Sequence, residues 1–464
     1  MPVAAQSICP KISRMIPRIA AIPLVTFIAQ HALAAISLDL SSQQSIQQAA
    51  SKAAVGMLQY YTGNRPGDVP GNLPQPYYWW EAGAMFGALI DYQYFTGDTQ
   101  YNDLIMQAML HQVSSPDNVF QPANQTRTLG NDDQAFWAMA ALSAAENRFP
   151  NPPASSKVSW LTTAQGVFNL QAARWNTDTC GGGLKWQIFA FNAGYNYKNT
   201  ISNGCFFHMG SRLAVYTGNQ SYADWAEKTW DWAQSIGLFD SQYNFYDGSD
   251  DGINCTQLDR HQWSYNAGTF LVGAANMYNF TGGSDIWKQR IEGIISNLHV
   301  FLQNDIMFEL SCEDAGTCNV DQRSFKAYFA RWMAMTIVRA PFTRSSLKPI
   351  LEASARAAAA TCTGGQDGNQ CGLNWRTGAF DGSTGVGEQM AVLEVIQNNL
   401  LDYVEAPATA ENGISQGDPS AGHAAVGPAD LNKSPITTAD RVGAWVMTLC
   451  IVISVVGIMV WIII

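Results

Sequence analysis

The chain is 464 residues long, carries a formal net charge of −11 and has only 14% charged residues. An acidic chain lacks the clustered positive charge that nucleic acid requires, so a nucleic-acid partner is excluded. Aromatic side chains make up 11% of the residues, including 15 tryptophans, and their ring faces suit a neutral, hydroxylated ligand such as a sugar.

Residues 1–34 predict a secretory signal peptide. Basic residues up to Arg18 precede an apolar run over residues 19–33, which ends in the small-residue pattern Ala32-Leu33-Ala34. A basic start, an apolar centre and an A-x-A site are typical of a cleaved signal. A membrane anchor is the alternative, but the run is short for a spanning helix and contains Pro23.

Residues 36–405 are expected to form one all-α domain. The phrase YTGN or a variant recurs at 61–64, 95–98, 216–219 and 280–283, and each glycine can take the left-handed conformation that ends a helix. Apolar character nearly all round predicts six buried helices: Tyr78–Tyr94, Asp133–Arg148, Gly204–Tyr216, Tyr265–Asn279, Phe325–Arg339 and Glu388–Tyr403. An amphipathic pattern predicts six helices that face solvent: Gln43–Tyr61, Tyr101–Val113, Ser156–Ala172, Ser221–Ile236, Asp285–Gln303 and Ser345–Ala359.

These two helix types alternate along the chain, so we expect an (α/α)6 barrel of six inner and six outer helices. The sustained alternation of apolar and polar residues that indicates strands does not occur. The turns after the inner helices are mostly short, whereas those before them are mostly long. The long loops should therefore converge on one face, where a rigid scaffold usually carries function.

The stretch GNDDQAFWAMAAL places Asp132 and Asp133 side by side at the start of an inner helix. Helix capping explains one acid there but not the pair. A metal site of the isoprenoid Asp-Asp-x-x-Asp kind fails because Phe136 occupies the last position. Retaining glycoside hydrolysis needs a nucleophile and an acid/base about 5–5.5 Å apart, which neighbouring residues can meet. Repulsion would keep one carboxyl protonated while the helix N-terminus stabilises the other as an anion.

Further residues near the long-loop face are expected to bind substrate. The aromatic candidates, for which core packing is the alternative, are Trp80, Trp137, Trp186 and Trp263. The polar candidates near inner-helix starts are Asn131, Gln134, Tyr265, Asn266 and Arg331. A second acidic cluster, predicted either as a Gly-rich turn or as the acceptor side of a cleft, contains Asp247, Asp250 and Asp251. The histidines expected to be structural are His208 and His261.

Cysteine spacing and glycosylation signals indicate an extracellular protein. The expected disulfides are Cys312–Cys318, Cys362–Cys371 and Cys180–Cys255, with Cys205 as the free thiol, although the sequence leaves other pairings open. No Cys-x-x-Cys or His-x-x-x-His spacing occurs, so no metal or other cofactor is expected. Sequons for N-glycosylation begin at Asn124, Asn219, Asn254, Asn279 and Asn432.

The C-terminal part of the chain predicts a GPI-anchor signal. Residues 406–441 combine a Gly/Ser/Pro-rich linker with a polar spacer, and residues 442–464 form an uncharged apolar tail that such processing removes. A single spanning helix is the alternative, but no basic flank follows the tail. Ser420 and Asn432 are both candidates for the attachment residue.

Several long motifs resemble the fungal branch of glycoside hydrolase family 76, the GPI-anchored mannan endo-1,6-α-mannosidases. They are GNDDQAFWAMAAL, YYWWEAGAMFGALIDY, CGGGLKWQ, QWSYNAGTFLVGAA and FKAYFARWMA, and together they extend the resemblance over nearly the whole mature chain. The resemblance implies an (α/α)6 fold and a retaining mechanism with Asp132 as the nucleophile and Asp133 as the acid/base. It also implies a transglycosidase that moves GPI-anchored proteins onto wall glucan, with the mannose-containing GPI glycan as donor.

We therefore expect a secreted enzyme of the fungal cell surface, held by a GPI anchor at the plasma membrane or in the wall. Its donor would be α-1,6-mannan or a GPI glycan, and β-glucan would be the acceptor. The alternative from another class is a catalytically inactive glycan-binding wall protein. The sequence does not decide whether water or a sugar hydroxyl resolves the intermediate.

Overall fold

The computed structural model describes residues 36–422, apart from 116 and 367, and residues 438–463. The expected signal peptide at 1–34 and the candidate attachment residue Asn432 lie outside the described residues.

Two sets of helices alternate along the described chain, as the apolar patterns predict. The inner helices are α2 (Trp79–Thr96), α4 (Asn131–Glu146), α6 (Thr200–Thr217), α8 (Ser264–Phe280), α10 (Phe325–Arg339) and α12 (Val386–Gln397). The outer helices are α1 (Gln43–Leu58), α3 (Asn102–Gln112), α5 (Trp160–Ala173), α7 (Gln220–Ser235), α9 (Asp285–Asn297) and α11 (Arg344–Ala360).

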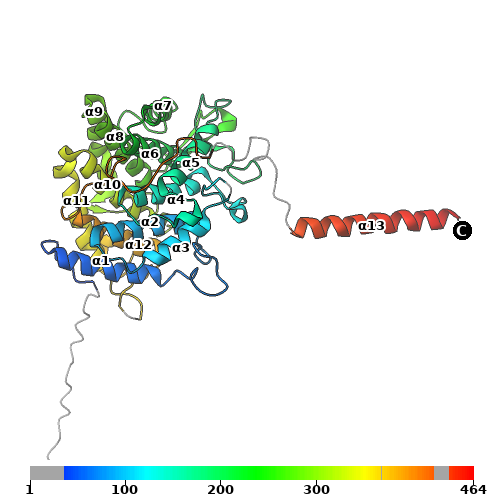
Figure 1. Ribbon diagram of the computed structural model, residues 1–464, viewed down its shortest axis with the longest axis horizontal. Helices are drawn as coiled ribbons and strands as arrows, with labels where there is room; N and C mark the ends of the chain where they lie inside the picture. The colour runs from blue at the N-terminus through cyan, green and yellow to red at the C-terminus, as the bar shows by residue number, and fades with distance from the viewer. Residues whose placement is uncertain (1–35, 116, 367, 423–437, 464) are drawn as a thin grey trace, which may run out of the picture. The chain divides into compact units, whose positions relative to one another are not determined.

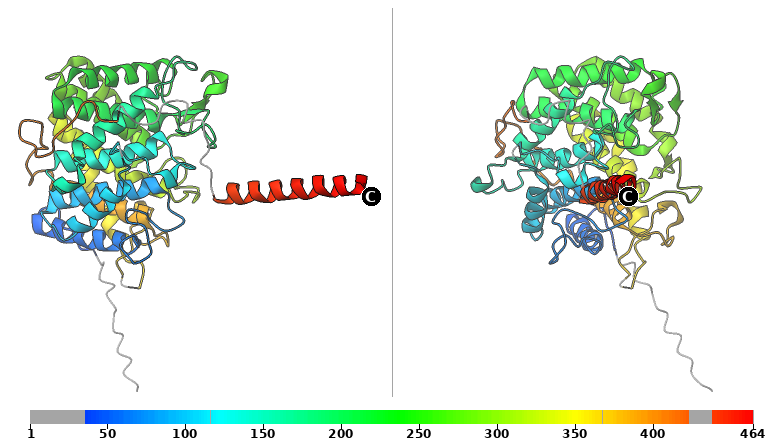
Figure 2. Two further views of the ribbon diagram at one scale, coloured as in Figure 1. Left: turned by 45° about the vertical axis from the view of Figure 1, so that its right-hand side comes forward. Right: turned by 90° about the vertical axis from the view of Figure 1, so that its right-hand side faces the viewer.

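The inner helices form a closed ring. Each one packs against the next, and α12 completes the ring by packing against α2. Figure 1 shows α1, α2 and α12 side by side although they come from opposite ends of the domain, and the left view of Figure 2 shows the barrel helices running alongside one another. The expected (α/α)6 barrel is confirmed.

The Thr-Gly turns end helices at some of the expected places. Gly97 and Gly218 adopt left-handed conformations, with φ of 75° and 70°, directly after α2 and α6. Gly282, with φ of 66°, lies two residues after Phe280, the last residue of α8. Gly63 differs, because α1 already ends at Leu58 and the turn follows separately.

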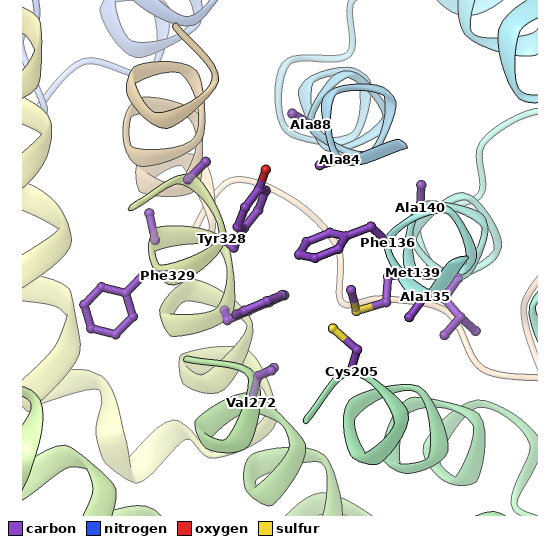
Figure 3. Close-up of a cluster of buried hydrophobic side chains, with 14 of the residues drawn as sticks. Ala84, Ala88, Ala135, Phe136, Met139, Ala140, Cys205, Val272, Tyr328 and Phe329 are labelled. Carbon is purple, nitrogen blue, oxygen red and sulfur yellow. The ribbon is translucent and has the colours of Figure 1, made fainter. Parts of the chain in front are cut away.

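The barrel interior is filled with side chains rather than open. Figure 3 shows Phe136 and Met139 of α4, Cys205 of α6, Val272 of α8 and Tyr328 of α10 gathered in one buried cluster. Their burial stabilises the ring, since each large apolar side chain removed from water contributes roughly 1.5–3 kcal/mol.

Two short antiparallel sheets accompany the helices. The first contains β1 (Tyr197–Asn199), β2 (Gly248–Asp250) and β3 (Leu258–Asp259), and the second pairs β4 (Leu302–Gln303) with β5 (Ile306–Met307). In the first sheet Asn199 lies opposite Gly248, immediately before α6 begins. This sheet joins two of the long loops at the start of an inner helix.

The segment that composition predicts as a linker from residue 406 packs on the barrel as far as Gly422. Its backbone donates hydrogen bonds to the carbonyl of Glu146 at the end of α4 and to that of Tyr216 in the last turn of α6. It then follows α5, where Gly422 lies against Gly166. The packed chain therefore continues well beyond residue 405.

The C-terminal helix α13 spans Thr438–Ile463. Within the described part of the chain, no helix has both the length and the apolar character needed to cross a membrane.

Candidate active site

The starts of the inner helices and the long loops before them enclose a cleft of about 300 Å³. Asp132 and Asp133 lie in it at the start of α4, with Trp80 from α2 and Trp186 from the loop before α6. The predicted convergence of the long loops on one face thus produces a cleft around the acid pair.

Local hydrogen bonds hold the two acids in place. Asp133 Oδ2 accepts the N–H of Gly130 at 2.6 Å, which is the side-chain half of a capping box. Asp132 Oδ1 accepts the N–H of Asp133 at 3.0 Å, and its Oδ2 accepts from Asn199 Nδ2 at 3.4 Å. Capping therefore uses one oxygen of Asp133, while the pair as a whole faces the cleft.

In this geometry the pKa values of the two carboxyls are both raised, but not by the same set of causes. Burial raises the pKa of Asp132 to about 7, although hydrogen bonds from the Asp133 N–H and Asn199 oppose the rise. Burial and then the charge of Asp132 raise the pKa of Asp133 well above its usual range. Asp133 is thus the member that keeps a proton when Asp132 is an anion.

The first sheet supplies one wall of the cleft. Tyr197 donates its hydroxyl to Asp247 Oδ2 at 2.8 Å, and both side chains line the cavity. Burial raises the pKa of the Asp247 carboxyl, opposed by the Tyr197 hydrogen bond. Asn199, at the end of the same strand, caps α6 by accepting the N–H of Ser202 and contacts Asp132 with its amide nitrogen.

Aromatic side chains from α2, α8 and α10 supply the other wall. Trp80 donates its indole N–H to Asp321 at 3.1 Å. The ring of Tyr265 stacks on Phe325 with centroids 3.8 Å apart. Ring faces and fixed polar groups together are the usual composition of a site for a small polar ligand.

The cleft is strongly acidic. Besides the pair, it contains Asp247, Asp259 and Asp321, and His261 pairs with Asp259 at 2.5 Å. Among the residues that the structure describes, no lysine or arginine lines this cavity. Such a site suits neutral or cationic sugars and disfavours anionic ones.

Comparison with known families identifies the chain. A model of glycosyl hydrolase family 76 matches residues 45–411. The chain belongs to glycosyl hydrolase family 76. Its relatives include the mannan endo-1,6-alpha-mannosidases DCW1 and DFG5 of Saccharomyces cerevisiae, which are 48% and 42% identical to it. Each match covers 92% of this chain, and 95% of DCW1 or 94% of DFG5.

Solved structures of the family share the fold. Dfg5 from Chaetomium thermophilum, solved in complex with glucosamine, is 46% identical with a TM-score of 0.81, and the match covers 84% of this chain and 98% of that one. An α-1,6-mannanase of Salegentibacter is 16% identical with a TM-score of 0.61, covering 77% and 99% of the two chains. This family 76 chain is accordingly a glycosidase.

Several predicted substrate-binding residues of this family 76 chain do line the cleft. They are Trp80, Trp186, Trp263, Tyr265 and Asp247. Asp250 lines an adjoining depression rather than the main cavity, and its carboxylate also caps a short turn through Gly252. Asp251 is buried beside Lys185 and forms an ion pair with it.

Three predicted contacts on α4 are corrected. Trp137 is fully buried, stacks on Trp79 and donates its N–H to the Trp79 carbonyl, so it belongs to the core. Asn131 and Gln134 point to the outside of the ring, where their side-chain amide oxygens accept hydrogen bonds from Arg174. Helical rotation explains Asn131 and Gln134, which flank the acid pair and face other directions, whereas Trp137 follows Asp133 by four residues and lies one turn deeper, in the core.

Two further predicted contacts are also wrong. Arg331 lies one and a half turns into α10, where it bonds Glu394 and, at 2.8 Å, Asp91 among buried side chains away from the cleft. Asn266 is fully buried and does not line the cavity. A buried arginine needs paired carboxylates, so its role here is structural.

Other residues that line the cleft were not among the binding residues expected from the sequence. They include Tyr197, Asn199, Asp259, His261, Asn319 and Asp321. Asn199 was missed because α6 was expected to begin at Gly204, whereas it begins at Thr200. An asparagine before a helical run is a recognised capping signal, so this residue could have been found.

The expected disulfides are present in the structure. They join Cys180 to Cys255, Cys312 to Cys318 and Cys362 to Cys371, and Cys205 is a buried free thiol. His208 is buried, and burial lowers its pKa well below the usual range, in keeping with a structural role. The described sequon residues Asn124, Asn254 and Asn279 are exposed, while Asn219 is half-buried and caps α7.

Proposed function

We propose that this glycosidase is a retaining, endo-acting α-1,6-mannosidase or transmannosidase of the fungal cell surface. The observation that carries the proposal is the Asp132–Asp133 pair, which lies at the start of α4 in an acidic, aromatic-lined cleft. The names of DCW1 and DFG5 support α-1,6-mannan as the substrate class. An intact pair with divergent pKa values favours a catalyst over the glycan-binding alternative.

One solved relative supports the assignment of the pair. A Salegentibacter α-1,6-mannanase was solved with α-1,6-mannotriose as an inactive variant in which two neighbouring aspartates are changed to asparagine. In this chain the neighbouring aspartates that face the cleft are Asp132 and Asp133. We assign Asp132 as the nucleophile and Asp133 as the acid/base, in keeping with the burial and the neighbouring charge of Asp132 that raise the pKa of Asp133 well above its usual range.

In the first step an oxygen of Asp132 attacks the anomeric carbon of the donor mannose and forms a glycosyl ester. The bond from that carbon to the leaving oxygen breaks, and the leaving oxygen takes the proton of Asp133. Asn199 holds Asp132 Oδ2 in place through its amide nitrogen. The product of this step is a covalent intermediate on Asp132 with Asp133 ionised.

In the second step an oxygen nucleophile attacks the same carbon and loses its proton to Asp133. The ester bond breaks and Asp132 returns to a carboxylate. Water gives hydrolysis, and a sugar hydroxyl gives transfer. We propose transfer to β-glucan with the mannose core of a GPI glycan as donor. Chaetomium Dfg5 was solved with glucosamine, and an acidic cleft of the kind described here suits such an amino sugar.

We also propose secretion and GPI anchoring, on the basis of the terminal sequence patterns. Release of the surface-bound protein by phosphatidylinositol-specific phospholipase, after deacylation of the anchor, is the expected result. Retention of the protein under those conditions would contradict the anchor and favour a spanning tail.

The catalytic proposal is tested by Asp132→Asn and Asp133→Asn, assayed with α-1,6-mannan oligosaccharides. Each change should reduce turnover by at least about 10³-fold, since loss of one member of a catalytic unit disables it. Tyr403→Ala, an exposed tyrosine that does not line the cleft, is the folding and expression control. Unchanged turnover in both aspartate variants would overturn the assignment.

Hydrolysis and transfer are separated by analysing products with and without a β-1,3-glucan oligosaccharide. Transfer predicts mannose-containing glycans that carry the added acceptor at their reducing end. Free mannose-ended products alone, at saturating acceptor, would contradict the transferase proposal while leaving the glycosidase assignment intact.

A further inference from the structure

Asn131, the residue directly before the acid pair, joins the start of α4 to the loop before α6 and to the end of α5. Its backbone N–H donates to the Trp186 carbonyl at 2.8 Å, and its side-chain amide donates to the Lys185 carbonyl at 2.8 Å. Its own carbonyl accepts the side-chain amide of Gln171 at 2.6 Å, and its Oδ1 accepts Arg174 Nη1 at 3.0 Å. All four of its polar groups are therefore bonded, and one partner is the backbone of a residue that lines the cleft, Trp186.

Arg174 holds the first turn of α4 from outside the ring. The residue follows α5 directly, and its Nη1 donates both to Asn131 Oδ1 and, at 2.7 Å, to Gln134 Oε1. These two acceptors belong to the residues on either side of Asp132 and Asp133 in the sequence. Arg174 does not line the cleft itself, so it clamps both flanks of the acid pair from behind.

The surroundings of Arg174 are unusual for a cation. Its Nη2 donates to Gln121 Oε1 at 2.7 Å, so these three acceptors are all neutral side-chain amides. Among the residues that the structure describes, no carboxylate pairs with it, and burial lowers the pKa of its guanidinium to about 9. A desolvated cation is normally balanced by a carboxylate, and a cation beside a helix N-terminus opposes the helix dipole. Stability alone does not account for a cation here, whereas a planar fork that fixes several acceptors at once does.

We propose that Arg174 and Asn131 are positioning residues that fix the acid pair against the Trp186 wall of the cleft. This inference rests on the proposed function. A backbone bridge between Gly130 and Gln187 accompanies the hydrogen bond from Asn131 to Trp186, so the two segments are joined like neighbouring strands. Because Arg174 grips the first turn of α4 as well, the acids cannot shift relative to Trp186 without breaking these bonds.

The test removes the clamp with Arg174→Met, which keeps an apolar stem but donates no hydrogen bond. On α-1,6-mannan oligosaccharides, kcat should fall about tenfold to 100-fold with a smaller change in KM, because a displacement approaching 1 Å costs up to about 10²-fold in rate. The pH at which kcat/KM falls on the acid side should stay unchanged, since the clamp fixes the position of the pair rather than its charge. A kcat within about threefold of wild type would overturn the proposal. A shift of that pH with unchanged kcat at the optimum would also overturn it, because Arg174 would then act through its charge.

Gln165→Met is the matched control. Gln165 lies earlier on α5, is fully buried, and bonds the Tyr222 hydroxyl and the backbone of Asp418. Both changes leave polar groups without partners, so both should lower Tm. Only Arg174→Met should lower kcat when the two variants are assayed well below their Tm values. Equal losses of kcat would indicate a general effect of lost stability and would overturn the proposal.

Asn131→Ala, alone and combined with Arg174→Met, shows whether the two residues act together. Each single change breaks the same hydrogen bond, so the double variant should lose less kcat than the product of the two single losses. A double loss equal to that product would mean that the residues act independently, which would overturn the shared role.

Hydrogen exchange gives a readout that does not depend on turnover. The N–H of Asn131 is bonded to the Trp186 carbonyl, so it should exchange faster in Arg174→Met and at the wild-type rate in Gln165→Met. Unchanged exchange in Arg174→Met would overturn the clamp whatever the kinetics show. Faster exchange together with no turnover by the wild-type protein would contradict the proposed function and would leave the clamp supported.

Discussion

Replacing Gly130 by alanine tests how closely the acid pair is positioned. The backbone at Gly130 has φ −91° and ψ 164°, which alanine adopts without strain. The added β-carbon would lie 2.2 Å from Asp132 Oδ1 and 3.2 Å from Asp133 Oδ2. Restoring ordinary contact moves Asp132 Oδ1 by about 1 Å, and a misplacement of that size costs about 10²-fold in rate.

The displaced oxygen is the one that accepts the Asp133 N–H, so rotating it away also removes that hydrogen bond. We expect kcat/KM on α-1,6-mannan oligosaccharides to fall about 100-fold, mainly through kcat. Unfolding stability should fall by only about 1–3 kcal/mol, the usual cost of added volume in a packed site.

The assay pairs steady-state kinetics with thermal unfolding. Gly210→Ala is the control, because its β-carbon would crowd Phe168 at 3.1 Å in the middle of α6, away from the pair. The control should lose stability without loss of kcat. A folded Gly130→Ala protein with kcat/KM within about threefold of wild type would refute the claim that Asp132 Oδ1 needs this position.

Four other outcomes follow from the structure. Burial raises the pKa of Asp132 to about 7 and that of Asp133 still higher. We therefore expect kcat/KM to decrease below about pH 7, where Asp132 becomes protonated, and to decrease again at high pH, where Asp133 loses its proton. Both folded-state pKa values exceed the unfolded ones, so the pair stabilises the fold at low pH and loses this contribution as pH rises. Asp133→Asn removes one of the two titrating groups, so it should raise Tm more at pH 8 than at about pH 4. Changing Cys180 and Cys255 together to alanine removes a cross-link between residues 75 apart in the sequence. The free energy of unfolding, measured with denaturant, should decrease by about 4 kcal/mol. Arg331→Ala should cost about 3–5 kcal/mol by leaving buried carboxylates unpaired, and a changed KM without lost stability would contradict its structural role.

Much of the fold could be predicted because it depends on local pattern. Buried helices such as α2 and α8 are apolar all round, and α7 and α9 are amphipathic, so their order alone indicates a barrel. The packing of residues 406–422 could not be predicted. Its contacts are hydrogen bonds, many of them between its backbone and barrel side chains such as Asn169, and close approaches of glycine, none of which small polar composition reveals.

The site likewise contains residues that could be predicted from the sequence and residues that could not. Asp132 and Asp133 stand out because two acids at one helix start have no local explanation. Asp321 and Asp259 reach the cleft only through loops folded from distant parts of the chain, and nothing in their neighbours distinguishes them from turn residues. Arg331 illustrates the opposite error, since a polar residue near an inner-helix start suggested a ligand contact where a buried ion pair exists.

The packed segment after residue 405 has a mechanical consequence. It passes the ends of α4 and α6 and then runs along α5 from Leu161 toward Asn169. A pull applied beyond Gly422 would therefore load these contacts before it reached α12. Because these contacts are spread along the segment, they would break one after another. The segment would therefore bear tension on the tail before the ring and the acid pair did.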